Sequence, residues 1–287
     1  MSTERPRIGF VGLGSMGGAL VEALLAAGHA PVVYDVDPAR VDEAAAKGAV
    51  PAGSLDEVAT GADIVGICVA NDAQVRSVLE SGVLNGLAPG AVVSLHSTLL
   101  PETVRWAAAA AAERGVGLVE APVTGGATKA AEGRLTFLLS GSDDDLAAVE
   151  PLLDACAGLR VPAGPLGNAN LLKLCINLQT YVTHLAVHEA AALAHALDLP
   201  LDGLKAAMEA NGQLGQMTRD YLVLHDLPDE VLDDPGLVAL RAPQLAIIAK
   251  DIGLMEAVAA GIDHQVPAAH LAGERLDDTY RMPGRDR

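Results

Sequence analysis

The chain has 287 residues, of which 51% are hydrophobic, 20% are charged and only 2% are aromatic. At about 100–200 residues per domain, this length indicates one large or two ordinary domains. Thirty-seven acidic residues against 19 basic ones give a formal net charge of −18. Because such a field repels phosphate backbones and anionic membrane surfaces, the composition argues against nucleic-acid and membrane-surface partners.

Cysteine content and hydropathy restrict the class of protein further. The three cysteines, Cys68, Cys156 and Cys175, are widely spaced and form no CxxC motif, which argues against a disulfide framework and a structural zinc site. The N-terminus lacks the apolar core of a signal peptide, and the longest apolar stretch, residues 171–199, carries Lys173 and three histidines. We therefore expect a cytoplasmic protein with no metal and no membrane span.

The first ~160 residues alternate short β-like runs with helical runs, a pattern typical of a parallel α/β sheet. The predicted strands are Ile8–Val11, Pro31–Asp35, Asp63–Val69, Ala91–Leu95, Gly117–Ala121 and Leu135–Ser140. Strand signals stop after Pro162, and the pattern from Asn168 onward is helical. The predicted helices there are Asn168–Leu197, Leu201–Ala210, Gln216–Leu224, Pro243–Gly261 and Pro267–Arg281. This change predicts a domain of residues 1–163 and an all-helical domain of residues 164–287.

A glycine-rich motif follows the first strand and opens a helix. It reads Gly12-Leu13-Gly14-Ser15-Met16-Gly17. Glycines at this spacing permit a tight turn and a close approach of the backbone to a pyrophosphate, and the helix N-terminus supplies N–H donors. The second strand ends at Asp35, whose carboxylate can accept hydrogen bonds from an adenosine ribose. The fold class is therefore α/β: a Rossmann-type doubly wound parallel sheet, followed by an all-α C-terminal domain joined by a long interdomain helix.

Asp35 also bears on the choice of cofactor. A carboxylate at this position repels a 2′-phosphate, so NAD is favoured and NADP remains possible. Arg40, five residues further on, could reach a 2′-phosphate, but we expect it to be a solvated residue of the following helix.

A polar stripe lies along the predicted helix that joins the domains. Its members recur every three or four residues: Asn170, Lys173, Asn177, Tyr181, His184 and His188. A buried stripe of this kind needs partners or a ligand, because unpaired polar groups in a core are costly. A half-buried lysine has a depressed pKa, which suits proton transfer near neutral pH. His184 and His188 lack a third metal ligand, which favours a satisfied helix face or a pocket wall over a metal site.

Four motifs in order resemble those of the β-hydroxyacid dehydrogenase family, which includes 3-hydroxyisobutyrate dehydrogenases and the 6-phosphogluconate dehydrogenases. They are the extended glycine motif Gly9–Gly17, the loop Glu120–Gly126, the segment Gly167–Asn177 and the segment Lys250–Leu254. The resemblance implies NAD(P)-dependent hydride transfer between nicotinamide and a β-hydroxy acid, or its semialdehyde or ketone. It also implies a small-molecule substrate and a homodimer or homotetramer.

The resemblance assigns a role to each matching residue. Lys173 would be the general acid/base, and Asn177 would orient the substrate. The backbone of Thr124, Gly125 and Gly126 would bind the substrate carboxylate, since consecutive glycines beside a hydroxyl form an anion-binding concavity. Thr98 would lie beside the nicotinamide ribose, and Lys250 against the nicotinamide end of the cofactor.

Several positions depart from the family pattern. Leu95 replaces an acid, Thr124 replaces a serine and Ala169 replaces a glycine. Lys129 and Arg134 stand where the family more often has small residues. We hypothesise that one of these two cations meets a second anionic or polar group of the substrate.

Two other functions remain open on the sequence. An imine reductase shares this fold but carries Asp or Tyr at the position of Lys173. A non-catalytic NAD-binding protein built on an inactive dehydrogenase would lose the lysine. Lys173, Asn177 and Lys250 are all present, which favours the dehydrogenase.

Overall fold

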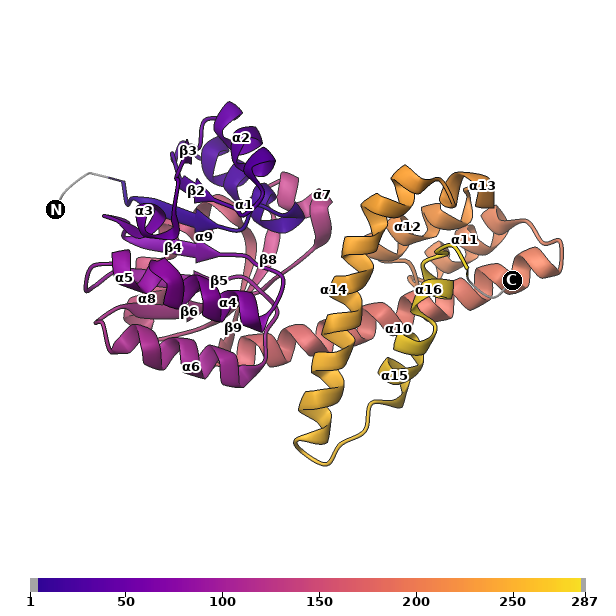
Figure 1. Cartoon of the computed structure of the whole chain (residues 1–287). Helices are drawn as coiled ribbons and strands as arrows, with labels where there is room; N and C mark the ends of the chain where they lie inside the picture. Colours follow the sequence, from indigo (N-terminus) through magenta and orange to yellow (C-terminus); the bar gives the residue numbers. More distant parts are fainter. Residues whose placement is uncertain (1–4, 285–287) are drawn as a thin grey trace. The chain divides into compact units, whose positions relative to one another are not determined.

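The computed structural model describes residues 5–284, apart from the side chains of residues 127, 128 and 131. The chain forms two compact units, one ending at Lys173 and the other beginning at Leu174 (Figure 1). The first unit contains every strand, and the second is built from helices. An α/β domain followed by a helical one is thus confirmed, whereas the functional boundary near residue 163 stays a prediction.

The first unit is organised around a nine-stranded sheet in the order β3-β2-β1-β4-β5-β6-β8-β7, with β9 beside β8. The strands are β1 Ile8–Val11, β2 Val32–Tyr34, β3 Val50–Pro51, β4 Ile64–Ile67, β5 Val92–Leu95, β6 Gly117–Glu120, β7 Val123–Thr124, β8 Leu135–Ser140 and β9 Ala157–Gly164. Pairing is parallel from β3 through β6 and again between β8 and β9. Only β8 runs antiparallel to its neighbours β6 and β7. The Rossmann-type, mainly parallel sheet is therefore confirmed.

Helices bury both faces of this sheet. They are α1 Ser15–Ala26, α2 Pro38–Ala46, α3 Leu55–Ala59, α4 Asp72–Val78, α5 Leu84–Gly86, α6 Pro101–Ala112, α7 Gly126–Ala131, α8 Asp143–Ala148 and α9 Glu150–Cys156, with a π-helical turn at Leu79–Val83. Successive residues of a strand point to opposite faces. Accordingly, Phe10 lies in one core cluster with Leu20, and Val11 lies in the other with Val104. The central strand β1 is fully buried, as its uninterrupted apolar run predicts.

All six predicted strands are present, and none is longer than predicted. The structure adds three strands that the sequence pattern did not reveal. Two of them, β3 and β7, have two residues each, too few for a periodic signal. The third, β9, contains Pro162 and two glycines, which hid it. A proline is tolerated there because β9 pairs with β8 alone at the edge of the sheet.

The second unit is all-helical, as predicted. Its helices are α10 Asn168–Ala196, which starts in the first unit, α11 Leu201–Ala210, α12 Gln216–Leu222, a 3₁₀ turn Val223–His225, α13 Asp229–Leu232, α14 Pro235–Ala260, α15 Pro267–Glu274 and α16 Leu276–Thr279. Its core gathers apolar and aromatic side chains from α10, α12, α14 and the C-terminal segment, among them Leu185, Tyr221, Ile252 and Tyr280.

Two predicted helix boundaries in this unit are wrong. Helix α14 begins at Pro235 rather than Pro243, because Asp234 caps it by accepting the Gly236 and Leu237 N–H groups at 2.9 and 3.1 Å. Pro243 therefore lies inside the helix. The predicted helix Pro267–Arg281 is divided into α15 and α16 at Arg275.

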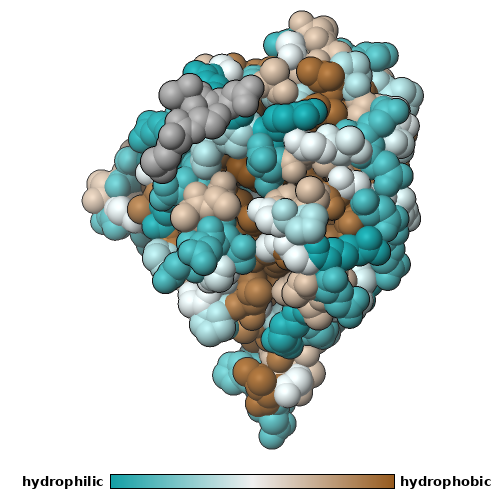
Figure 2. Space-filling model, turned by 90° about the vertical axis from the view of Figure 1, so that its left-hand side faces the viewer, coloured by the Kyte–Doolittle hydropathy of each residue, from teal (hydrophilic) through white to brown (hydrophobic). Residues whose placement is uncertain are grey.

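The surface agrees with the charged composition. On the face drawn in Figure 2, hydrophilic side chains (teal) alternate with smaller apolar areas (brown). Within residues 5–284, no helix combines the length and the apolar character needed to cross a membrane.

Candidate active site

The glycine-rich loop between β1 and α1 has the backbone geometry that a pyrophosphate requires. Gly12 has a φ of +92°, and a Cβ there would lie 2.3 Å from the carbonyl oxygen of Cys68. A Cβ at Gly17 would lie 1.9 Å from the Gly12 oxygen, so both positions admit only glycine. At Gly14 the nearest atom is 3.6 Å away, which leaves the backbone open to a ligand. No side chain caps α1, so its first N–H groups are available to an anion.

The remaining residues of the motif support this loop. Ser15 is exposed at the first position of α1, whereas the side chain of Met16 packs against the core beneath. The Leu13 N–H donates to Asp35 Oδ2 at 2.6 Å, which ties the loop to the end of β2. The loop and its acidic neighbour therefore fit a dinucleotide cofactor.

Arg40 lies closer to the cofactor loop than expected. Its Nη1 is 3.7 Å from Asp35 Oδ2 and is the nearest atom to the side-chain position of Gly14. Its Nε lies 3.4 Å from Asp37 Oδ2, and the side chain is 49% exposed. Arg40 is therefore half exposed but also pairs with the carboxylates of Asp35 and Asp37, beside the predicted adenosine site.

The loop after β5, which carries Thr98, is fixed on both sides of that residue. The Ser97 hydroxyl donates to the Val69 carbonyl at 2.7 Å and accepts the Val69 N–H at 2.9 Å. The Leu99 N–H donates to the side chain of Asn170 at 2.8 Å. Thr98 itself is partly exposed between these two anchors.

The start of α10 is held by a buried carboxylate that the sequence did not single out. Glu120, at the end of β6, accepts the Gly167 N–H at 2.7 Å, the Asn170 N–H at 2.7 Å and the Asn170 side-chain amide at 2.8 Å. Glu120 and Asn170 are both fully buried. Lys173 lies one turn further along the same helix and is partly exposed. The sequence signal for Glu120 was its place at the head of the second motif.

A second buried carboxylate orients Asn177. Asp251 Oδ2 accepts the Asn177 amide at 2.8 Å and the Tyr181 hydroxyl at 2.9 Å, and Asp251 Oδ1 lies 2.9 Å from Lys250 Nζ. Asp251 is 2% exposed. Because a carboxylate only accepts, the NH₂ group of Asn177 must face it, and the amide oxygen is directed elsewhere as an acceptor.

Tyr181 is a permanent donor in this network. Burial, together with the neighbouring Asp251 carboxylate, raises the pKa of Tyr181 far above its usual value. The sequence grouped Tyr181 and Asn177 on one stripe. Their shared partner Asp251 belongs to the motif Lys250–Leu254, but the sequence assigned it no role.

The loop after β7 forms a turn of consecutive glycines. Gly125 has a φ of +133° and Gly126 a φ of +74°, values that favour glycine. The side-chain position of Gly126 faces open space, whereas that of Gly125 is 3.0 Å from Lys129 Cδ. Thr124 is partly buried at the end of β7. The loop is open enough to take a carboxylate.

The two cations that follow this loop differ in their surroundings. Arg134 pairs with Glu132 at 3.3 Å, and its side chain is 71% exposed. Lys129 is exposed and lies against Gly125. Lys47, Lys205 and Lys250 form ion pairs with carboxylates, but no such pair involves Lys129 among the described residues.

Histidines of the polar stripe take part in an aromatic cluster of the helical unit. His184 Nδ1 is 2.7 Å from the Tyr280 hydroxyl, and its ring stacks on Tyr221 with centroids 4.4 Å apart. The rings of His188 and His225 lie 5.3 Å apart. Within residues 5–284, no three His, Cys, Asp or Glu side chains are grouped to hold a metal ion. His184 therefore lies on the face of α10 that packs against Tyr221 and Tyr280.

Burial predicts that acid weakens the fold. It lowers the pKa of His96, His184 and His225 from 6.5 to about 4, and at His225 the neighbouring His188 and Arg281 contribute to that shift. Between pH 6.5 and pH 4 these histidines are protonated in the unfolded chain but not in the folded one. The free energy of unfolding is therefore highest above pH 6.5 and falls as the pH drops towards 4. For one fully buried histidine the loss is about 3 kcal/mol.

The prediction is tested by measuring chemical unfolding from neutral pH to about pH 5, where few carboxylates titrate. His184→Phe keeps the ring packing but cannot take up a proton. Its unfolding free energy should depend less steeply on pH than that of the wild type. An equal slope in both proteins would contradict the assignment for His184.

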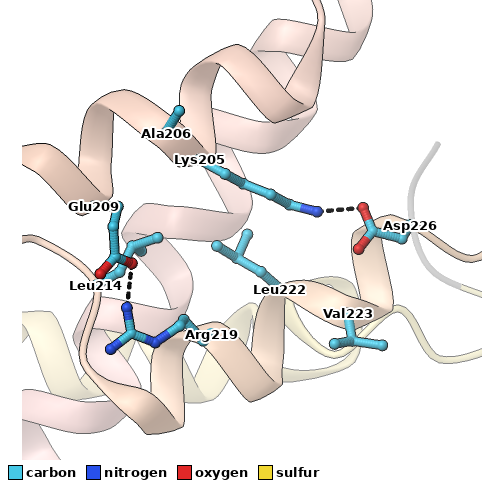
Figure 3. A pocket seen from close by; sticks show the side chains of 8 residues that line it. All are labelled: Lys205, Ala206, Glu209, Leu214, Arg219, Leu222, Val223 and Asp226. Carbon is cyan, nitrogen blue, oxygen red and sulfur yellow. Dashed lines mark hydrogen bonds and ion pairs between the residues drawn. The ribbon is translucent and has the colours of Figure 1, made fainter.

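A pocket of about 280 Å³ lies in the helical unit, and none of the predicted site residues lines it (Figure 3). Its four charged side chains pair with one another, Lys205 with Asp226 and Arg219 with Glu209. Leu214 and Leu222 contribute apolar surface. Each of its four charged side chains is therefore paired with an opposite charge inside the pocket.

The chain is similar to known dehydrogenases in sequence and in fold. Residues 7–170 match the family described as the NAD binding domain of 6-phosphogluconate dehydrogenase. The NAD-dependent L-serine dehydrogenase of Pseudomonas aeruginosa is 32% identical over 93% of this chain and 89% of its own length. The crystal structure of 3-hydroxyisobutyrate dehydrogenase from Salmonella typhimurium has a TM-score of 0.82 at 29% identity, covering 96% of this chain and 94% of that one.

Imine reductases are also structural neighbours. The enzyme from a Pseudomonas species has a TM-score of 0.69 at 20% identity, covering 97% of this chain and 96% of that one. A similarity at this level of identity shows a shared fold alone.

Proposed function

Since the chain belongs to the β-hydroxyacid dehydrogenase family, and is thus an oxidoreductase with a nicotinamide-cofactor domain, we propose that it oxidises a β-hydroxy acid reversibly, with Lys173 as general acid/base. The observation that carries the proposal is the placement of Lys173 on α10. Carboxylate-anchored amides flank it on that helix, Asn170 one turn before and Asn177 one turn after. Both named relatives act on β-hydroxy acids, L-serine and 3-hydroxyisobutyrate, which supports this substrate class.

Proton transfer is the part of the reaction that this chain's residues perform. In oxidation, the neutral Lys173 amine takes the hydroxyl proton, so the carbinol oxygen can form a carbonyl as the hydrogen on the same carbon departs with its electron pair. In reduction, the Lys173 ammonium returns the proton to the developing alkoxide. The bound nicotinamide cofactor supplies the hydride acceptor or donor.

Binding and orientation fall to the neighbouring groups. Asn177, whose amide is fixed by Asp251, orients the substrate so that the single hydroxyl proton is donated to Lys173. Backbone N–H groups of Thr124, Gly125 and Gly126 hold the substrate carboxylate. Gly12 to Gly17 and Asp35 hold the pyrophosphate and the adenosine ribose, and Thr98 and Lys250 contact the nicotinamide end.

The proposal is tested by following nicotinamide absorbance with the purified wild type, each of the two cofactors and a panel of β-hydroxy acids. Turnover of at least one β-hydroxy acid is expected. Cofactor binding without turnover of any hydroxy acid, together with reduction of cyclic imines, would contradict it.

NAD is the proposed cofactor, and the Asp35–Arg40 pair predicts how to change the preference. Asp35→Ser removes the carboxylate that repels a 2′-phosphate and that holds the Arg40 guanidinium. The ratio of kcat/KM for NAD to that for NADP should fall by about tenfold or more, since a charge contact of about 1.4 kcal/mol corresponds to that factor.

A double variant controls this prediction. Asp35→Ser combined with Arg40→Ala also loses the cation and should gain less activity with NADP than Asp35→Ser alone. If the double variant gains as much as the single one, Arg40 has no part in the preference.

The substrate is proposed to carry a second anionic group that meets Lys129. This lysine lies against the substrate loop and is paired with no carboxylate of the described residues, whereas Arg134 is occupied by Glu132. Lys129→Ala should raise KM for such a substrate by about tenfold and leave the KM for the cofactor unchanged. Arg134→Ala is the matched control and should change neither. An unchanged KM in Lys129→Ala would contradict the role.

We infer a homodimer or homotetramer from the family resemblance. Exposed apolar side chains of the helical unit support this: Leu193 is 61% exposed, Leu197 59% and Leu240 77%. Where such side chains form one contiguous patch, they commonly mark a protein–protein contact.

A further inference from the structure

One buried network connects two parts of the first unit that carry proposed active-site residues. Glu120 lies at the end of β6, Asn170 in the first turn of α10, and Leu99 in the loop after β5. These segments are separated by as many as 71 positions in the sequence. The network rests on the four hydrogen bonds already described, all between 2.7 and 2.8 Å.

The chemistry of the network permits one arrangement only. The carboxylate of Glu120 accepts on both oxygens, so the NH₂ group of Asn170 must face it. The oxygen of the same amide then faces the Leu99 N–H. A flipped amide would place a donor against that N–H and an acceptor against the carboxylate. Because both side chains are fully buried, water cannot compensate such a mismatch.

Glu120 also determines how α10 begins. The Gly167 and Asn170 N–H groups belong to the start of the helix, where backbone donors lack intrahelical partners. The carboxylate satisfies both and complements the positive end of the helix dipole. Lys173 follows Asn170 by three residues, so its backbone position is set by this cap.

We propose that Glu120 is a positioning residue which, through Asn170, holds the loop of Thr98 and the helix of Lys173 in one fixed arrangement. The inference rests on the proposed function, because it assigns a catalytic purpose to the position of Lys173 relative to Thr98. A displacement of about 1 Å between reacting groups can cost a factor of about 10² in rate.

Asn170→Ala is the principal test, because it removes the connection and leaves the helix cap in place. The Glu120 carboxylate keeps the two backbone donors, so the variant should fold. We expect kcat to fall by about tenfold or more. The primary deuterium isotope effect on kcat should rise, because hydride transfer becomes slower than product release.

A measurement without cofactor or substrate accompanies the kinetics. Hydrogen exchange of the Leu99 amide should accelerate by about tenfold or more in Asn170→Ala, since its acceptor is gone. Glu120→Gln is the second variant, because in either orientation its NH₂ group would face either the Gly167 N–H or the donors of Asn170. It should show the same kinetic change, with the rates referred to the folded, cofactor-binding fraction.

Asn168→Ala is the matched control at the same helix start. Its side chain donates to the Ala163 carbonyl at 3.0 Å and makes no bond to Glu120. It should keep the wild-type kcat, isotope effect and exchange rate at Leu99.

Two failures can be separated. If the wild type is active and Asn170→Ala matches it in kcat and isotope effect, the positioning role is overturned and the proposed function stands. If the wild type turns over no β-hydroxy acid, the proposed function fails, and this inference fails with it.

Discussion

Replacing Lys173 with alanine should lower kcat by about 10²–10⁴-fold while the dissociation constant for the cofactor stays near that of the wild type. The range is that of a lost general acid/base, because the neighbours of Lys173 on its stripe of α10 cannot exchange a proton near neutral pH. Asn170 and Asn177 carry amides, and the phenol of Tyr181 is kept protonated by burial. The measurement is steady-state turnover combined with a cofactor-binding titration on the same protein.

Lys47→Ala is the matched control. Lys47 is half exposed and pairs with Glu22 on the surface, so its loss should leave kcat unchanged. A Lys173→Ala protein that keeps more than about a tenth of the wild-type kcat would remove Lys173 from the proton-transfer step.

Asp251→Ala should be the most destabilising single change in the helical unit that we predict. It leaves the Asn177 amide and the Tyr181 hydroxyl without their shared acceptor and removes the carboxylate that forms an ion pair with Lys250. Breaking a buried charged network by removing one member costs about 3–5 kcal/mol, because the remaining groups stay desolvated. The quantity to measure is the unfolding free energy in urea.

Asp251→Asn separates stability from orientation. Its oxygen can still accept from Asn177 and Tyr181, so the loss of stability should be smaller. Its NH₂ group then faces the Lys250 ammonium, and activity should fall because Lys250 loses its ion pair with Asp251. Asp226→Asn is the control: it breaks an aspartate–lysine pair at a half-exposed position and should change stability by less than about 1 kcal/mol. Equal losses in Asp251→Ala and Asp226→Asn would contradict the importance of the buried network.

The fold was predictable because its strongest signals are local. The glycine motif, the apolar run of β1 and the acid ending β2 lie within 35 residues and define the first βαβ unit. The 3.6-residue periodicity likewise predicted α10 almost to its ends. Where two local signals conflicted, the prediction failed. Pro243 predicts a helix start, but the helix begins eight residues earlier at Pro235, where Asp234 caps it.

The candidate site was predictable only in part. Spacing along α10 placed Asn170, Lys173 and Asn177 on one stripe, but it could not say what those amides face. Their partners Glu120 and Asp251 lie 50 and 74 positions away in the sequence. Which carboxylate meets which amide depends on how strands and helices pack, and no periodic pattern records that.

The two halves of the polar stripe have different partners. Its first half, around Lys173, is anchored by carboxylates, whereas His184 belongs to an aromatic core with Tyr221 and Tyr280. A buried polar residue on an apolar helix is expected to have a hydrogen-bond partner. That partner can be an aromatic side chain of the core instead of a ligand.

The central claim is that a hydride passes between the hydroxyl-bearing carbon of a β-hydroxy acid and nicotinamide. The most direct test is to incubate the wild type with NAD and a β-hydroxy acid, such as serine or 3-hydroxyisobutyrate, deuterated at that carbon, and to analyse the reduced cofactor by mass spectrometry. We predict one deuterium per reduced nicotinamide, and an amount of reduced cofactor about 10²-fold or more smaller with Lys173→Ala over the same time. Reduced cofactor without deuterium, or a cofactor that binds and is never reduced by any β-hydroxy acid, would contradict the account.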